Sequence, residues 1–349
     1  MPDLDRLVTL GVDTHADVHA AAALDERGRL LDTMTLPTTS AGYQALLAWA
    51  AEFGTVDRVG IEGTGSYGAG LARWLRDQGL VVLEVDRPDR RARRQHGKSD
   101  PLDAEAAARA VQSGRARGIP KAGDGRVEAI RALRIARRSA LDARGRVTNQ
   151  LHALRVTAPD ALRDELRELS LSRLVARAVR FRVPAVIDAP IDATRMGLRS
   201  LARRHQALSA EIAALDGQLR RLVSAAAPRL VARPGIGIDS AGQFLVTAGD
   251  NPARLRSEAA FGMLTGTSPV PASSGKTVRY RLNRAGDRQA NYSLHMVVLT
   301  RMAHDPRTQA YMRRRAAEGK TTKEIMRCLK RYVAREVYRL LVPMPALTT

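Results

Sequence analysis

The first third of the chain alternates apolar runs with polar turns. Residues 7–13, Leu-Val-Thr-Leu-Gly-Val-Asp, predict a buried strand that ends at Asp13. Apolar runs at 19–24 and 30–36 flank an Asp-Glu-Arg-Gly turn, so we expect a meander of three antiparallel strands. Further elements are predicted as helices at 41–53 (capped by Thr39-Ser40), 67–78 and 100–111, and strands at 56–61 and 80–85. This order predicts a mixed α/β sheet with helices on both faces.

The middle of the chain has the periodicity of long helices. Residues 124–155 contain no proline and keep apolar heptad positions. A clearer seam steps by three and four residues through Leu198, Leu201, His205, Leu208, Ile212, Leu215, Leu219 and Leu222. This a/d pattern predicts that two long helices pair as a coiled coil, within one chain or between chains. We interpret His205 as a polar residue that sets the register.

The last third begins with a glycine-rich turn at 233–242, which resembles the hairpin of helix-hairpin-helix DNA-binding motifs. The backbone N–H groups near Gly235 and Gly237 could meet a phosphate there; the alternative is a turn that only separates helices. The elements predicted next are a helix at 255–264, a loop at 266–277, an extended run at 278–283, a helix opened by 284–291 and two basic helices within 308–342. The predicted fold is α/β plus α: an α/β domain at 1–120, a helical coiled-coil spacer at 121–228 and a mainly helical domain at 229–349.

Charge narrows the class of partner. The 349 residues include 57 Lys and Arg against 36 Asp and Glu, a formal net charge of +21. Such an excess points to a polyanion, with nucleic acid the first candidate and an anionic membrane surface the second. No apolar run reaches the roughly 18 residues of a membrane span, and residues 1–5 lack the start of a signal peptide. One cysteine, Cys328, excludes an internal disulfide and a zinc site with several Cys ligands. We expect a cytoplasmic protein that contacts DNA or RNA.

Four carboxylates follow the predicted elements. Asp13 and Glu62 end two strands, where open α/β sheets build their sites. Asp100, as N-cap before Pro101, and Asp103 lie three residues apart at a helix start. Asp13 alone could merely cap a turn. The set of four suits a pair of Mg²⁺ or Mn²⁺ ions about 4 Å apart, the arrangement used for phosphoryl transfer. In order, Asp, Glu and Asp-x-x-Asp resemble the RuvC-like branch of the ribonuclease H fold.

Two basic stretches suit phosphate contacts. The first, in the loop at 87–98, contains Arg90, Arg91, Arg93, Arg94 and Lys98. The second surrounds the serine pair Ser273-Ser274 with Lys276, Arg279, Arg281, Arg284 and Arg288. Cationic neighbours can activate a serine hydroxyl for attack on a DNA phosphate. The alternatives are a solvated charge run for the first stretch and a loop that only contacts the DNA backbone for the second.

The order of these motifs resembles the DEDD-type transposases of the insertion sequence 110 family, with the related Piv-type DNA invertases. The N-terminal resemblance is carried by Gly11-Val12-Asp13, Glu62-Gly63-Thr64-Gly65-Ser66-Tyr67 and Lys98-Ser99-Asp100-Pro101-Leu102-Asp103-Ala104. The C-terminal resemblance is carried by Pro234-Gly235-Ile236-Gly237, Ser273-Ser274-Gly275-Lys276 and the stretch from Asn283 to Asn291.

The resemblance implies a division of roles. Asp13, Glu62, Asp100 and Asp103 would bind the metal ions, and Ser274 would join covalently to DNA. The serine and the four carboxylates would meet in a composite site, within a homodimer or homotetramer. A non-coding RNA encoded by the same element would select the element ends and the target DNA. The protein would be bacterial and associated with the nucleoid. Relatives carry a second glycine where this chain has Lys276, which keeps Ser273 as an alternative nucleophile.

Three functions follow from these patterns. The first is a site-specific DNA recombinase or transposase that moves an insertion sequence by metal-assisted serine attack. The second is a RuvC-like, junction-resolving nuclease that uses water and needs no serine. The third is a nucleic-acid-binding scaffold without cleavage, against which the complete set of carboxylates argues.

Overall fold

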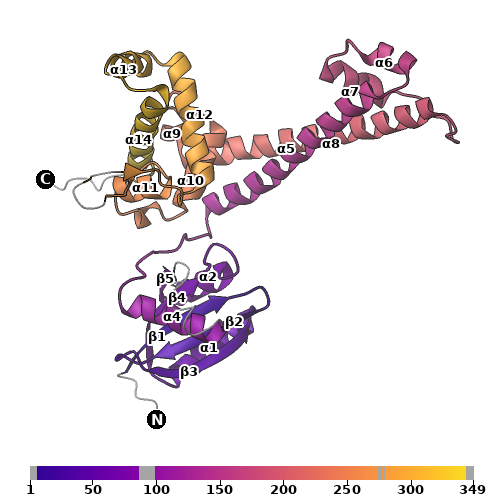
Figure 1. The fold of residues 1–349 in the computed structure, drawn as a ribbon. Helices are drawn as coiled ribbons and strands as arrows, with labels where there is room; N and C mark the ends of the chain where they lie inside the picture. The colour runs from indigo at the N-terminus through magenta and orange to yellow at the C-terminus, as the bar shows by residue number, and fades with distance from the viewer. Residues whose placement is uncertain (1–5, 86–98, 274–276, 278–279, 343–349) are drawn as a thin grey trace. The chain divides into compact units, whose positions relative to one another are not determined.

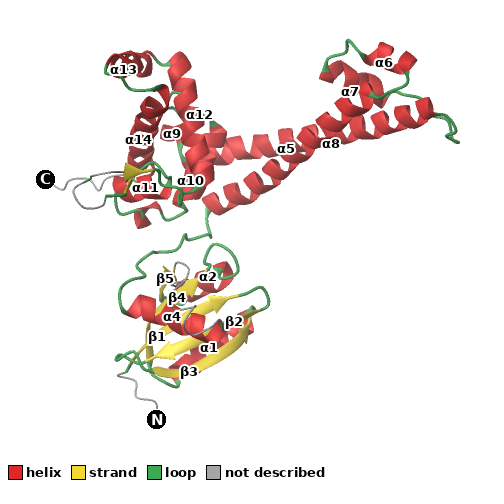
Figure 2. Ribbon diagram, in the orientation of Figure 1, coloured by secondary structure: helices red, strands yellow, loops and turns green. Residues whose placement is uncertain are grey.

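The computed structural model describes residues 6–85, 99–273, 277 and 280–342, and these residues form two compact units. Unit 1 comprises Met1–Gly125, Ala248–Gly262 and Leu341–Thr349. Unit 2 comprises Arg126–Thr247 and Met263–Leu340. Unit 1 contains a sheet and its helices, whereas unit 2 is helical apart from one small hairpin (Figures 1 and 2).

Unit 1 is built on a five-stranded mixed sheet with the order β3-β2-β1-β4-β5. The first three strands run antiparallel, as the predicted meander requires, and β1, β4 and β5 are parallel. The strands are β1 Leu7–Thr14, β2 Val18–Leu24, β3 Leu30–Pro37, β4 Thr55–Glu62 and β5 Val81–Val85. The predicted α/β class and the predicted strands are confirmed, with ends shifted by one or two residues.

Helices cover both faces of this sheet. Val8, Leu10 and Val12 of β1 pack into one core with α1 (Ser40–Ala51) and α2 (Ala69–Asp77). The opposite face carries α4 (Asp100–Gln112), whose buried side chains are mostly alanines. Thr39 caps α1 as predicted, because its side chain accepts a hydrogen bond from the Gly42 N–H.

α4 lies unusually close to the sheet because glycines face it. A Cβ atom on Gly11 of β1 would lie 2.1 Å from the Ala104 carbonyl oxygen and 2.2 Å from the Ala108 nitrogen. A Cβ on Gly60 of the neighbouring strand would lie 2.5 Å from a Val111 methyl group. The helix backbone therefore rests directly on the strands, which only glycine permits at these two positions.

The start of α4 differs from the prediction in one detail. Ser99, with extended backbone angles of φ −145° and ψ 145°, is the N-cap residue, and Asp100 is the first residue of the helix. Asp100 was predicted as the cap. Its carboxylate instead lies in the first helical turn with Asp103, where the helix dipole favours negative charge.

Unit 1 also contains a segment from far along the chain. The side chain of Asn251 accepts a hydrogen bond from the Ala122 N–H at 2.9 Å and donates one to the Pro120 carbonyl oxygen at 3.0 Å. Arg254, in the 3-10 turn Pro252–Arg254, donates to the Ile119 carbonyl oxygen at 3.5 Å. These bonds satisfy polar backbone groups of the stretch that leaves the sheet domain, so residues 248–262 are part of its structure.

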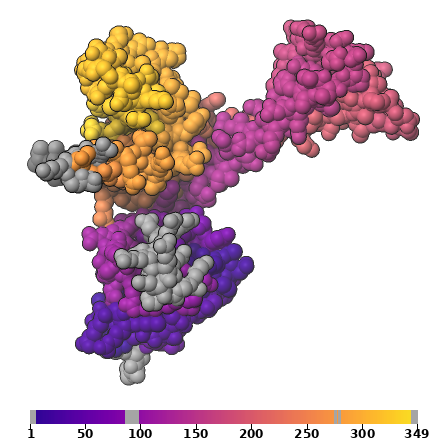
Figure 3. Space-filling model, viewed as in Figure 1, coloured from indigo at the N-terminus to yellow at the C-terminus, as the bar shows by residue number. Residues whose placement is uncertain are grey.

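In unit 2, two long helices run antiparallel, α5 (Arg126–Val156) and α8 (Pro190–Ala226). Their direction follows from pairs such as Arg137 with Asp216 and Arg144 with Ser209. Two short helices, α6 (Asp160–Leu166) and α7 (Leu171–Val179), pack with one end of this pair into a separate hydrophobic cluster. Figure 3 shows this cluster as a compact lobe at the far end of the pair.

The rest of unit 2 is a bundle of shorter helices. Its elements are α9 Pro228–Val231, α10 Ile238–Ala248, α11 Glu258–Leu264, β6 Val270–Pro271, β7 Tyr280–Arg281, α12 Arg288–His304, α13 Pro306–Ala317 and α14 Thr322–Leu341. Three of these elements, α10, α11 and α14, include residues of unit 1. The two C-terminal helices are confirmed, but the predicted helix at 255–264 begins only at Glu258. The helix predicted from 284 begins at Arg288, because Asp287 caps it and accepts from the Gln289 and Ala290 N–H groups. Across the part of the chain that the structure describes, no helix has both the length and the apolarity needed to cross a bilayer.

We expect Gly11→Ala to destabilise unit 1 by at least about 1–3 kcal/mol, because the new methyl group would overlap the α4 backbone. Urea unfolding followed by circular dichroism measures the change. Gly65→Ala is the matched control, because a Cβ there meets nothing within 4 Å. Equal stabilities for the two variants would contradict the close packing.

Candidate functional site

The ends of β1 and β4 bring two predicted carboxylates to one face of the sheet. Side chains alternate along a strand, so Asp13 shares the face of Gly11, and Glu62 shares the face of Gly60. Both glycines face α4. The Thr14 hydroxyl donates a 2.8 Å hydrogen bond to the Glu62 carbonyl oxygen and so joins the two strand ends beside the site.

α4 brings the other two carboxylates to the same face. Asp103 is 5% exposed, whereas Asp100 is exposed at the helix start. The opposite end of α4 is fixed to the turn between β2 and β3: Arg109 donates to the Gly28 carbonyl oxygen at 2.9 Å, and Gln112 donates to the Asp25 carbonyl oxygen at 2.7 Å. A helix held at one end and pressed on glycines along its length has little freedom to move its first turn away from the strands.

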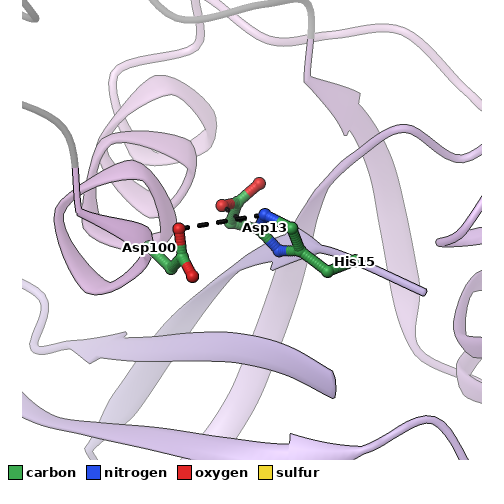
Figure 4. A group of neighbouring side chains, drawn as sticks. All are labelled: Asp13, His15 and Asp100. Atoms are coloured by element: carbon green, nitrogen blue, oxygen red, sulfur yellow. Dashed lines mark ion pairs between the residues drawn. The ribbon is translucent and has the colours of Figure 1, made fainter. Parts of the chain in front are cut away.

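The structure gathers Asp13, His15 and Asp100 into one cluster, in which one ligand atom from each residue lies within 4.8 Å of the others. His15 Nδ1 is 3.8 Å from Asp13 Oδ2, and His15 Nε2 is 3.8 Å from Asp100 Oδ1. Figure 4 shows the two carboxylates and the imidazole pointing toward one another. Sequence reasoning missed His15; its only signal was its position two residues after a carboxylate at a strand end.

Burial and neighbouring negative charge disfavour the ionised form of the Asp13 carboxyl group. Burial raises the pKa of the Asp13 carboxyl group above the ordinary value of 3.8, and the negative charges of Asp103 and Asp100 raise it further, while His15 lowers it. A bound cation would remove this penalty. The oxygen donors suit Mg²⁺ or Mn²⁺, and the His15 imidazole adds a nitrogen donor, which transition metals such as Mn²⁺ accept more readily than Mg²⁺ does. The residues present therefore fit a divalent metal ion.

The four predicted ligands are not equally placed. Asp13 and Asp100 lie in the cluster itself. Asp103 is close enough for its charge to raise the pKa of Asp13. Glu62 is half-buried at the end of the adjacent strand, on the same face of the sheet but outside the cluster of three.

The second part of the predicted site lies in unit 2, in the chain that connects β6 and β7. Ser274, Lys276 and Arg279 lie outside the described residues, and Ser273 is exposed. The framework around this connection is described. Asn283 donates to the Met263 carbonyl oxygen at 2.9 Å, and Asn291 donates to the Thr265 carbonyl oxygen at 2.7 Å. These bonds hold the stretch from Asn283 to Asn291 against the end of α11.

The remaining predicted nucleic-acid contacts fall in three groups, of which two are basic side chains and the third is a glycine turn. Arg281, Arg284 and Arg288 are exposed in unit 2. The five basic residues Arg90, Arg91, Arg93, Arg94 and Lys98 lie outside the described residues.

The glycine turn before α10 is the third group. Gly235 has a left-handed backbone (φ +75°), and the Gly237 carbonyl oxygen accepts from the Ala241 N–H in the first turn of α10. Arg301 of α12 donates to the Pro234 carbonyl oxygen at 2.8 Å and so holds this turn against the bundle. The turn precedes a helix start, as the predicted phosphate contact requires.

In the metal-free protein at neutral pH, we expect Asp13→Asn to increase the free energy of unfolding. The raised pKa means that folding favours the protonated form, so the stability contributed by Asp13 falls as pH rises above 3.8. The gain from the substitution should vanish near pH 3. Saturating Mg²⁺ should stabilise the original chain, by about 2.7 kcal/mol at 100 times its Kd, and should not stabilise the variant.

Thermal unfolding at pH 3 and pH 7, with and without Mg²⁺, measures these effects. Asp77→Asn is the control, because Asp77 is an exposed aspartate at the end of α2. An Asp13→Asn variant that Mg²⁺ stabilises as much as the original chain would refute Asp13 as a ligand.

We expect His15→Ala to weaken Mn²⁺ binding about tenfold or more and Mg²⁺ binding less, because imidazole is a better ligand for transition metals. Isothermal titration calorimetry with each metal measures the difference, with the exposed His304→Ala as control. Unchanged Mn²⁺ affinity would show that His15 does not contact the ion, and equal losses for both metals would contradict the expected preference for Mn²⁺.

Comparisons with known proteins show the family of the chain. Residues 10–158, which contain all four predicted carboxylates, match the DEDD transposase family of IS110, described as a transposase. Residues 227–313, which contain the serine segment, match a family described as transposase IS116/IS110/IS902 family. Over 139 residues, the chain is 30% identical to an insertion element IS110 uncharacterized 43.6 kDa protein from Streptomyces coelicolor, a match that spans 39% of this chain and 34% of that protein. Two family matches at successive parts of the chain, in the order of the motifs, lead to one conclusion: the chain belongs to the IS110 family of transposases.

Proposed function

We propose that the chain is a DNA recombinase that moves an insertion sequence by cutting and rejoining DNA strands. One observation carries the proposal: Asp13 and Asp100, from elements far apart in the sequence, converge with His15 into a cluster that fits a divalent cation. The excess of basic residues suits a polyanionic substrate such as double-stranded DNA. The sheet order and the carboxylates at its strand ends support a RuvC-like, ribonuclease H-like unit.

The residues that would hold Mg²⁺ or Mn²⁺, as a pair of ions, are Asp13, Glu62, Asp100 and Asp103, with His15 as an additional donor. When bound, a divalent ion pair stabilises the negative charge that develops on attacking and leaving oxygens during phosphoryl transfer. The chain itself supplies the negative charge that attracts these ions, and the tight packing of α4 keeps the ligands at fixed positions. Thr14 contributes by holding the β4 end next to the β1 end.

Ser274 is the proposed nucleophile, with Ser273 as the alternative. Its hydroxyl oxygen would attack a DNA phosphorus and lose its proton to a base or to water. The bond from phosphorus to one deoxyribose oxygen would break, and that oxygen would leave as a sugar hydroxyl. In the rejoining step, a sugar hydroxyl of another strand would attack the phosphoserine and release the serine. Cationic neighbours such as Arg281 and Arg284 would stabilise the phosphate charge in both steps.

The remaining expectations form part of the same proposal. The sequence-based division at residues 120 and 228 assigns a RuvC-like part, a coiled-coil spacer and a serine-containing part with a helix-hairpin-helix-like turn. Burial of Leu198, Ile212 and Leu219 on α8 supports the predicted seam. His205, also on the seam, is half-buried, and its pKa is lowered by burial and by Arg144. Kinship implies an element-encoded guide RNA and a homodimer or homotetramer with a composite site.

A trapped covalent complex tests the chemistry. We expect the protein, incubated with element-end DNA, guide RNA and Mg²⁺, to form an adduct that survives denaturation and runs as a shifted band. Ser274→Ala should remove the adduct while DNA binding persists, and Ser273→Ala is its matched control. Asp13→Asn and Asp100→Asn should abolish cleavage, because each removes a ligand charge.

Each alternative has its own outcome in this experiment. Metal-dependent cleavage that persists in Ser274→Ala without any adduct would favour a nuclease that uses water. An adduct that depends on Ser273 would move the nucleophile by one residue. Full cleavage by Asp13→Asn would refute the metal centre, and no cleavage by any form would leave a binding scaffold.

A further inference from the structure

Unit 2 contains a large basic cavity, and of its cations only Arg284 and Arg288 belong to the predicted nucleic-acid contacts. Its volume is about 1010 Å³, at the upper end of the roughly 300–1,000 Å³ typical of ligand pockets. α12 and α14 contribute most of its lining, and Pro269 and Leu282 line it from the two sides of the β6–β7 hairpin. The chain that connects these two strands includes both serines.

The lining is strongly cationic. Among the described residues that line the cavity, none is a carboxylate. The cations are Arg284, Arg288, Arg327, Lys330, Arg331 and Arg335. Four of them follow one face of α14, at a spacing of three or four residues. Such a concentration of positive charge favours a ligand with several negative charges in a row, as a phosphodiester chain has.

Aromatic rings lie among these cations. On α12, Tyr292 follows Arg288 by four residues, and its side chain is 57% exposed. On α14, Tyr332 is 51% exposed and is supported by an edge-to-face contact with Tyr311 at 5.6 Å and by the Arg335 guanidinium 6.0 Å from its ring centre. An exposed tyrosine ring offers an apolar face on which an unpaired base can stack. Rings interleaved with cations are typical of surfaces that bind single strands.

The base of the cavity is held in place by hydrogen bonds. The Lys330 ammonium group of α14 donates to the Asn291 side-chain oxygen of α12. The amide nitrogen of Asn291 donates in turn to the Thr265 carbonyl oxygen. Burial lowers the pKa of Lys330, and a bound phosphate would oppose that shift. Both helices are therefore fixed relative to each other where the ligand would lie.

We propose that this cavity binds a single-stranded stretch of nucleic acid, with its phosphates on the cations and an unpaired base stacked on Tyr292. Duplex is the poorer ligand, because the faces of its bases are covered by their neighbours and cannot reach a protein ring. The inference rests on the proposed function and specifies which form of the substrate unit 2 holds: a strand that has left the duplex. Pro269 and Leu282, which line the cavity, are the residues on either side of the β6–β7 hairpin, so a strand bound there contacts both ends of that hairpin.

Fluorescence anisotropy tests the proposal, with the full chain in EDTA and four labelled probes of one 12-nucleotide sequence: single-stranded DNA, single-stranded RNA and the duplex of each. We expect the single strands to bind more tightly than the duplexes. Tyr292→Leu should weaken single-strand binding about tenfold and leave duplex binding unchanged, because one stacked base is lost. Tyr292→Phe, which keeps the ring, should bind like the original chain. The difference between the DNA and RNA strands then identifies the source of the bound strand.

A second variant separates stacking from charge. Arg327→Gln should weaken all four probes similarly and reduce the dependence of binding on salt, because it removes one phosphate contact. The proposal would be overturned if Tyr292→Leu and Tyr292→Phe bound single strands equally well. It would also be overturned if Tyr292→Leu weakened the binding of single strands and duplexes to the same extent. The assay contains no free metal ion, so failure of the metal centre would leave its result unaffected, and failure of the cavity would leave strand cleavage to be judged separately.

Discussion

The close contact between α4 and the glycines of β1 and β4 is the constraint on which the candidate metal centre depends. At Gly11, a methyl group would overlap the helix backbone, so the distance between helix and sheet is set by main-chain atoms alone. This distance brings the first turn of α4, with Asp100 and Asp103, to the strand ends that carry Asp13 and Glu62. A bulkier interface would lift those carboxylates away from the strands, so backbone contact sets the geometry of the cluster.

Much of unit 1 could be predicted because its strands are apolar runs bounded by polar turns. Helix starts in the C-terminal part were harder to predict. Asp287 places the start of α12 by capping it, and a 3-10 turn at Pro252–Arg254 delays the start of α11. Such local hydrogen bonds compete with the helical ones, and the apolar periodicity of the sequence gives only a weak indication of where they form. The return of residues 248–262 to the sheet domain depends on long-range contacts and has no local signal.

The candidate site also has parts that the sequence predicts and parts that it does not. Asp13 was predictable because a carboxylate at the end of a buried strand is unusual without a charge partner, and Asp100 because it lies three residues from a second carboxylate, Asp103, at one helix start. His15 was not, because one histidine in a polar turn has no periodicity, and its proximity to Asp100 depends on how close α4 lies to β1. The cavity of unit 2 was hidden for a similar reason: basic and aromatic residues spaced along two helices look like solvated faces until the helices are placed side by side.

The interrupted course of unit 1 has a consequence for biosynthesis. The chain leaves this unit after Gly125, forms the long helical pair and its lobe, and returns only at Ala248. At a synthesis rate of roughly 5–20 residues per second, the ribosome needs on the order of ten seconds between these two points. During that interval the sheet and its acidic cluster can form, while the backbone groups of Ala122 and Pro120 that Asn251 later binds stay open to water. The nascent sheet domain thus gains residues 248–262 only after both long helices have been made, although Asp13, His15 and Asp100 are all present well before that point.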